Sequence, residues 1–428
     1  MGFMNIVNSL KDRVLKSEFN KSVLVLAGGT AVAQAVPILI SPILTRLYTP
    51  EDFGAFAIFM SITSIISVIA CGKYELAIML PEKDEDAINV AAVAFLFNVF
   101  VSGLFFLFIL FFGDWLLDVL NAKNLGWLIY LAPLSVFLLG TFSILNYTNN
   151  RFKLYKDISK ANIYKSLAGA VVQIGMGFLK YKTTGLVFGY IASQLFSNFK
   201  LFKNISKYFS SINYLYIKTM FHKYKNFPIY YVPGALIDTI SSNIHFFFIS
   251  FYFGIKVTGL YFFAYKIVSA PFSLIASAIS QVFFREFSFL FQKDLVSARN
   301  FLKKTALNLL ILSISVNFAL IVLIYVFWSF IFGLKWEDSK SIAIILLISY
   351  LIRFIVSPIS VALVSSNKLN YLLQWQILYF AVEVIFFAVI YIFHISFQDF
   401  LLYLIFVEWF IYSVYLIFIF KSVEIKKR

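Results

Sequence analysis

The chain has 428 residues, of which 61% are hydrophobic and only 13% are charged, so it lacks the charged surface that a soluble protein of this length needs. Its single cysteine excludes an intrachain disulfide and a cysteine-rich metal site, and its three scattered histidines suggest no metal centre. The net charge of +15 would suggest nucleic acid in a soluble protein, but in a membrane protein it first concerns which face carries the charge.

The first predicted element is a polar segment at 1–22, which carries Lys11, Arg13, Lys16 and Lys21. It has neither the short apolar core nor the small-residue cleavage site of a signal peptide. We therefore expect a retained cytoplasmic segment, either an amphipathic helix on the membrane surface or a frayed tail.

Apolar stretches of about twenty residues, the length that crosses a bilayer, recur along the rest of the chain. They are too long and too continuous for the alternating strands of a barrel, so they are expected to be helices. The sequence thus predicts an all-α membrane protein. Its twelve predicted transmembrane helices are 23–44, 55–80, 87–112, 126–148, 158–179, 184–201, 228–253, 258–284, 305–331, 341–364, 371–394 and 400–420.

The connections between these helices indicate the orientation. Most of the 36 Lys and Arg lie in the N-terminal segment and in every second connection after it. Cytoplasmic segments are enriched in these residues, so both termini are expected in the cytoplasm and the net charge reflects topology. None of the connections is long enough for an inserted soluble domain, so the function is expected to lie among the helices.

Short motifs recur in the two halves of the chain, which a basic connection at 202–227 separates. EDFGAFAIF matches KVTGLYFFA, FFGDW matches IFGLKW, and NNRFKLY matches SSNKLNYL. Three matches at equivalent positions indicate a duplication of six helices. Six helices return the chain to the same face, so the two lobes are parallel, and such a fold suggests a cleft that opens alternately to either side.

These observations divide the chain into five predicted parts. The parts are a cytoplasmic N-terminal segment at 1–22, an N-lobe at 23–201, a basic linker at 202–227, a C-lobe at 228–420 and a cytoplasmic tail at 421–428.

Charged side chains inside apolar stretches are costly, so they indicate either function or pairing. Lys266 stands in YFFAYKIVSAPF, where it either reaches the headgroups or a structural partner, or faces a central cavity as a cation. His245 lies at a similar depth. Arg353 and Glu383 lie near the middle of the tenth and eleventh predicted helices, where they form either a structural ion pair or part of a functional site.

Five further charges are candidates. Lys73 and Glu75 lie near the end of the second predicted helix, two residues apart and hence on different faces. Asp238 and Glu408 are lone acids inside helices, each either a proton carrier or an inert, hydrogen-bonded group. Arg46 lies at the outer end of the first predicted helix.

Motifs for catalysis are missing from the sequence. It contains no GxSxG, no HExxH, no P-loop and no EF-hand spacing, so we expect neither an enzyme nor ATP-driven transport by this chain. GGT at 28–30 and GMG at 175–177 are interpreted as small-residue packing signals inside helices.

Several longer stretches resemble a known family. SPILTRLYTPEDFGAFAIF and GKYELAIMLPEKDEDAINVA resemble the N-terminal signature of the Wzx-type flippases for lipopolysaccharide and capsule repeat units. FGLKWEDSKSIAIILLISYLIRFIVSPISVAL with NKLNYLLQWQ is similar to the same family's ninth to eleventh helices, and YFFAYKIVSAP is similar to its eighth. The family belongs to the MOP superfamily, with the MATE drug exporters and the MurJ-type lipid II flippases.

The resemblance implies a MATE-like fold, a place in the bacterial inner membrane and no enzymatic activity. It implies translocation of polyprenyl-diphosphate-linked oligosaccharides for O-antigen or capsule synthesis, by alternating access. Membrane lipids, a polysaccharide polymerase and chain-length proteins are the expected partners, and nucleic acid is not. MATE exporters typically use acidic residues early in the first lobe, and the first predicted helix has none.

Residue roles follow from this resemblance. Cations in the cleft would meet the diphosphate, and the candidates are Lys266, Lys73, Arg353 and Arg46. We expect no cofactor and no metal, but coupling to a proton or sodium gradient is open. The candidates for coupling or pairing are Glu75, Asp238, Glu383, Glu408 and His245.

Two other functions are considered. A MATE-type, ion-coupled exporter of small molecules differs from the flippase only in the signature stretches. A membrane-embedded glycan polymerase would usually carry a long periplasmic loop with basic residues, and the short outer connections disfavour it.

Overall fold

The computed structural model describes residues 18–206, 208 and 212–423. Within these ranges all regular structure is helical, so the predicted all-α class is confirmed. Residues 1–17 of the predicted N-terminal segment and residues 424–428 of the predicted tail lie outside the described residues.

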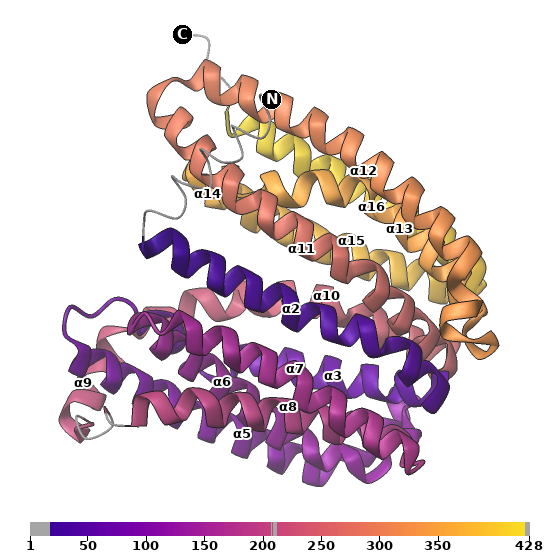
Figure 1. Cartoon of the computed structure of the whole chain (residues 1–428), viewed down its shortest axis with the longest axis horizontal. Helices are drawn as coiled ribbons and strands as arrows, with labels where there is room; N and C mark the ends of the chain where they lie inside the picture. Colours follow the sequence, from indigo (N-terminus) through magenta and orange to yellow (C-terminus); the bar gives the residue numbers. More distant parts are fainter. Residues whose placement is uncertain (1–17, 207, 209–211, 424–428) are drawn as a thin grey trace. The chain divides into compact units, whose positions relative to one another are not determined.

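Long helices make up most of the described chain (Figure 1). They are α2 (Glu18–Leu47), α3 (Pro50–Ala70), α5 (Asp84–Val119), α6 (Ala132–Arg151), α7 (Tyr155–Phe178), α8 (Lys182–Ile205), α10 (Val232–Phe253), α11 (Ile255–Lys293), α12 (Leu295–Phe332), α13 (Asp338–Ile359), α15 (Leu369–Ile392) and α16 (Phe397–Lys421). The short elements are α4 (Tyr74–Ala77), α9 (Tyr214–Lys223), α14 (Ala362–Ser365) and the turns η1 (Lys123–Leu131), η3 (Phe227–Tyr231) and η4 (Leu334–Trp336).

Ten helical segments of the described chain are long and apolar enough to cross a membrane, so this is a multi-pass membrane protein. α7 and α8 are not among the ten, because their sequences are more polar, with Lys160 and Lys165 inside α7. Both are nevertheless helices of 24 residues at the places where the sequence predicts spans. The count of twelve spans and the cytoplasmic termini stay predictions.

The predicted second helix, 55–80, is wrong at its C-terminal end. α3 stops at Ala70, and the next residues include Gly72 at φ 57° and Lys73 at φ 58°. A left-handed backbone cannot continue a right-handed helix, and the strain is larger for lysine than for glycine. Lys73 and Glu75 therefore lie in a turn and in the one-turn helix α4, outside the span.

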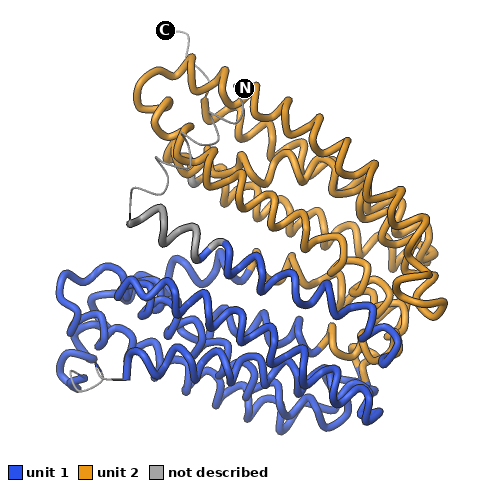
Figure 2. Tube along the Cα trace, in the orientation of Figure 1, with its two compact units in different colours: residues 1–48, 59–118, 123–236 blue, residues 49–58, 119–122, 237–428 orange. Residues whose placement is uncertain are grey.

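The described chain divides into two compact units (Figure 2). Unit 1 comprises the described residues of 1–48, 59–118 and 123–236, and unit 2 comprises the described residues of 49–58, 119–122 and 237–428. The predicted N-lobe and C-lobe fall largely within unit 1 and unit 2, respectively.

Small residues bring the helices of unit 1 together. A Cβ on Gly29 of α2 would lie 1.7 Å from the Ser159 hydroxyl of α7, and a Cβ on Gly177 would lie 2.9 Å from Leu47. Close backbone approach of this kind is how membrane helices gain packing energy. The predicted packing role of the GGT and GMG stretches is confirmed at these two glycines.

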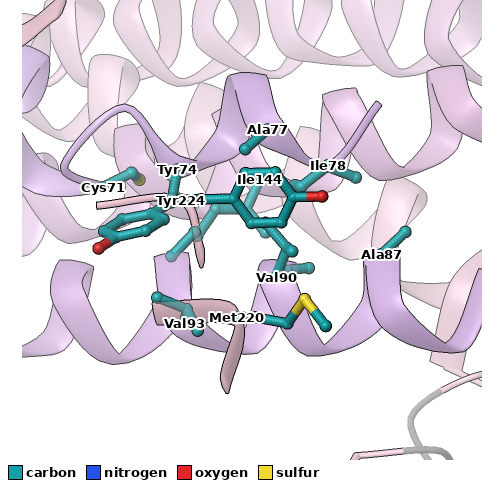
Figure 3. Close-up of a cluster of buried hydrophobic side chains, with 12 residues drawn as sticks. Cys71, Tyr74, Ala77, Ile78, Ala87, Val90, Val93, Ile144, Met220 and Tyr224 are labelled. Atoms are coloured by element: carbon teal, nitrogen blue, oxygen red, sulfur yellow. The ribbon is translucent and has the colours of Figure 1, made fainter. Parts of the chain in front are cut away.

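A buried apolar cluster in unit 1 joins the turn after α3 to its neighbours (Figure 3). Cys71 from the turn and Tyr74 of α4 pack with Val90 of α5, Ile144 of α6 and Met220 of α9. The cluster explains why the left-handed residues are tolerated: apolar burial on both sides of the turn stabilises it.

In unit 2, the start of α3 crosses the start of α11 at two glycines. A Cβ on Gly54 would lie 2.0 Å from the Ile255 carbonyl oxygen, and a Cβ on Gly259 would lie 1.7 Å from the Pro50 carbonyl oxygen. These glycines are the equivalent residues of EDFGAFAIF and KVTGLYFFA, one of the three matches of the predicted internal repeat. The repeated motif is thus a helix-crossing motif whose two copies contact each other.

Candidate functional site

A cluster of three buried ionisable side chains lies inside unit 2. Nε2 of His245 on α10 is 3.2 Å from Oε1 of Glu383 on α15. Glu408 on α16 completes the group, because one ligand atom from each residue lies within 4.8 Å of the other two. The three residues are 8%, 2% and 5% exposed, respectively. Two buried carboxylates in a membrane protein are costly, and such groups by default indicate a functional site.

Aromatic side chains enclose this cluster. The Tyr379 hydroxyl donates a long hydrogen bond of 3.5 Å to Oε1 of Glu408, and the Tyr261 ring stacks on the His245 ring with 6.4 Å between centroids. Such packing leaves little room for solvent, so the charges within it are screened less than at a surface.

Arg353 on α13 lies against the same group of aromatic rings. Its guanidinium is 4.9 Å from the centroid of the Tyr350 ring and 5.5 Å from that of the Tyr412 ring. The ion pairs formed by the described residues do not include Arg353 with Glu383, so the predicted structural pair is not formed. The Glu383 carboxylate lies next to the His245 ring instead, and Arg353 is held by aromatic faces.

A cavity of about 20 Å³ lies beside the cluster, and its lining includes His245, Arg353, Tyr379 and Glu408. A single water needs about 10–15 Å³, so the cavity holds one water or one small ion. Both carboxylate oxygens of Glu383 and Oε2 of Glu408 have no hydrogen-bond partner among the described residues. Three acceptor atoms therefore remain for a proton or a cation.

Charge balance defines what this cluster can bind. With both carboxylates ionised, Arg353 positive and His245 neutral, the group carries one net negative charge. A buried net charge is unfavourable, and one proton or one monovalent cation would remove it. Carboxylate oxygens are the ligands that hard cations prefer, whereas an imidazole nitrogen is preferred by transition metals, so the two carboxylates would supply the ligands for such a cation.

Lys266 lies elsewhere in unit 2, on α11. Its ammonium is 4.7 Å from the centroid of the Phe262 ring and 5.5 Å from that of the Phe56 ring, and the side chain is half-buried. Aromatic faces stabilise a partly desolvated cation by about 0.5–2 kcal/mol, which offsets part of the cost of its position.

The remaining predicted residues are not brought into the cluster. Lys73 is 3.9 Å from Oε1 of the buried Glu75, and burial raises the pKa of the Glu75 carboxyl. Arg46 is exposed in the last turn of α2, where its Nη1 donates to the Pro42 carbonyl at 2.7 Å. Asp238 is exposed on α10.

The tyrosines of the site were not predicted from the sequence, although a signal for them exists. Tyr379 precedes Glu383 by four residues, Glu408 precedes Tyr412 by four, and Tyr350 precedes Arg353 by three. These spacings place each tyrosine on the same helix face as a charge.

A family model for polysaccharide biosynthesis proteins matches residues 43–341. The chain belongs to this family of polysaccharide biosynthesis proteins. No curated protein sequence matches the chain.

Solved structures share its fold. The chain is 13% identical to an inward-facing multidrug-resistance MATE transporter of the MOP superfamily, with a TM-score of 0.68 over 92% of this chain and 96% of that one. It is 16% identical to the lipid II flippase MurJ, with a TM-score of 0.61 over 92% and 98% of the two chains. A MOP transporter from Pyrococcus furiosus gives 12% identity and a TM-score of 0.61 over 96% and 97%. At these identities the likeness shows the fold, which is that of MOP transporters.

Proposed function

We propose that this protein is a flippase that moves polyprenyl-diphosphate-linked oligosaccharide repeat units across the bacterial inner membrane by alternating access. The product would serve O-antigen or capsule biosynthesis. The observation that carries the proposal is the polysaccharide biosynthesis family over residues 43–341 on a fold shared with a lipid II flippase. Flipping makes and breaks no covalent bond, so the proposed protein is not an enzyme.

Lys266 is the cation that we propose for the diphosphate. A lysine ammonium binds phosphate oxygens through short, charge-assisted hydrogen bonds. The other candidates are less suited: the cavity at Arg353 holds only one water or ion, and Lys73 already lies beside the Glu75 carboxyl. Arg46, exposed at the end of α2, is kept as a secondary contact.

The cluster of His245, Glu383 and Glu408 is proposed as the coupling site. Together with Arg353 the cluster carries one net negative charge when both carboxylates are ionised. Loading with one proton or one sodium ion would neutralise this charge, and release of the ion would restore it. A ligand that binds one conformation better than another shifts the equilibrium between them. Moving one charge through a potential of 100 mV supplies about 2.3 kcal/mol, which is enough to bias such an exchange.

Complementation of a strain that lacks its own repeat-unit flippase tests the proposal. The wild-type gene is expected to restore surface glycan, whereas an exporter of small molecules would not. Lys266→Arg should retain much of the display because it keeps the charge, and Lys266→Ala and Lys266→Gln should lose it at normal membrane abundance. Lys256→Ala removes an exposed lysine from the same helix and is the control. Full display by Lys266→Ala at normal abundance would remove Lys266 from the substrate site.

A further inference from the structure

An apolar groove lies in unit 1 between α5 and α9. Its volume is about 360 Å³. α5 lines it with Val93, Leu96, Phe97 and Phe100, and α9 lines it with Tyr214, Ile217, Lys218 and Phe221. Each set follows the spacing i, i+3, i+4, i+7, so one continuous face of each helix is turned toward the other.

Contacts at both ends of α9 hold it in place. The Asn213 backbone N–H donates to Oδ1 of Asn89 at 2.9 Å, next to the N-terminus of α9. Near its C-terminus, the Tyr74 hydroxyl donates to the Phe221 carbonyl at 3.1 Å, and the Phe97 ring stacks on the Phe221 ring. Met220 belongs to the buried cluster of Figure 3. Because α9 is anchored at both ends, the space between the two faces is a feature of the fold.

Apolar chains fit this space better than water. The groove is far larger than the roughly 10–15 Å³ that one water needs, yet its lining offers water almost only apolar side chains. Leu96 and Phe100 are 55% and 62% exposed on α5, one of the membrane-spanning candidates. The groove therefore opens onto an apolar face of a candidate membrane-spanning helix, where we expect acyl chains.

Positive charge stands at the same groove. Lys218 is exposed and takes part in none of the ion pairs that the described residues form. The predicted linker, 202–227, contains five lysines and neither aspartate nor glutamate. An anionic headgroup is the complement of this surface, and basic segments next to a span attract anionic lipids.

We propose that the groove binds one anionic phospholipid, with an acyl chain between α5 and α9 and its phosphate on Lys218. The single lysine matches the single charge of a phosphodiester, and phospholipid chains already surround the α5 face. A lipid held here would tie the helix that follows α8 to the membrane surface. The site is independent of the proposed substrate and of the ionisable cluster in unit 2.

Native mass spectrometry of the full chain tests this site. The delipidated protein in neutral detergent is titrated with phosphatidylglycerol and with phosphatidylcholine of the same chains. We expect one phosphatidylglycerol to bind about fivefold more tightly than phosphatidylcholine, because one lysine near an anionic headgroup contributes about 1 kcal/mol. Lys218→Ala and Lys218→Gln should abolish this preference. Lys223→Ala removes the same charge from the same helix outside the groove and should keep it.

A second variant tests the acyl chain separately from the charge. Leu96→Trp fills the groove from an exposed position without changing the charge, so it should weaken the binding of both lipids severalfold. An equal loss of the phosphatidylglycerol preference in the Lys218 and Lys223 variants would overturn the proposal in favour of diffuse electrostatic attraction. Unchanged lipid binding by Leu96→Trp would show that the acyl chain lies outside the groove. Displacement of phosphatidylglycerol by lower concentrations of polyprenyl phosphate would assign the groove to the lipid carrier instead.

Discussion

Gly259→Ala tests the helix crossing at the start of α11. The new Cβ would lie 1.7 Å from the Pro50 carbonyl oxygen and 2.8 Å from the Gly54 backbone nitrogen. Cβ atoms essentially never come within 3.0 Å of a non-bonded heavy atom elsewhere in the structure, and both of these neighbours are backbone atoms that cannot rotate away. The two helices must therefore separate by about 1.3 Å at this point.

The free-energy cost follows from this separation. Overpacking that moves the backbone costs about 1–3 kcal/mol, and two backbone contacts place this variant near the upper value. The higher helix propensity of alanine relative to glycine offsets about 1 kcal/mol of this cost. The net loss of stability is about 2 kcal/mol, which corresponds to a fall of about 4–8 °C in the melting temperature for a unit of this size.

Thermal unfolding of the purified protein in detergent measures this loss. Gly103→Ala on α5 is the matched control, because a Cβ there meets nothing within 4 Å. It should melt at the wild-type temperature or slightly above it. If Gly259→Ala has the same melting temperature as Gly103→Ala, the close crossing of α3 and α11 does not exist in the folded protein.

Three further predictions concern coupling, burial and topology. Glu383→Gln keeps the shape of the side chain but cannot ionise, so transport should lose its response to a proton or sodium gradient, and an unchanged response would remove Glu383 from coupling. Burial raises the pKa of the Cys71 thiol, so the thiol stays protonated at pH 8. Maleimide should therefore label the native protein far more slowly than the unfolded one. Rapid labelling of the native protein would contradict the buried turn. Reporter fusions after Phe227 and Lys304 should report cytoplasm and a fusion at Trp336 the outer face, and an outward segment at 203–227 would refute the parallel repeat.

The apolar composition of the chain made the positions of the helices predictable. α5 and α12 are long apolar runs that lipid forces into helices, and even the more polar α7 and α8 follow the predicted ranges. The end of α3 was not predictable in the same way. Gly72 is one glycine in an apolar run, and its left-handed backbone, shared by Lys73, depends on tertiary packing around the turn.

Single charges of the site were predictable, but their partners were not. A charge inside an apolar run is conspicuous, so His245, Glu383 and Glu408 could each be named. Arg353 and Glu383 lie at equal depth in their predicted transmembrane helices, which suggested that they are partners. Depth, however, gives only the position of a residue along the helix axis and not the direction of its side chain. The partner depends on the direction in which each helix face points, and this packing turned Glu383 toward His245 and Arg353 toward tyrosines.

Flipping in proteoliposomes tests the proposed function most directly. The purified protein is reconstituted with a polyprenyl-diphosphate oligosaccharide, and a glycosidase added outside reports how much of the substrate has crossed to the outer leaflet. The proposal predicts that substrate trapped in the inner leaflet becomes accessible at a rate that Lys266→Ala abolishes and Lys266→Arg retains. Substrate that stays protected with the wild-type protein, under imposed proton and sodium gradients alike, would contradict the flippase assignment.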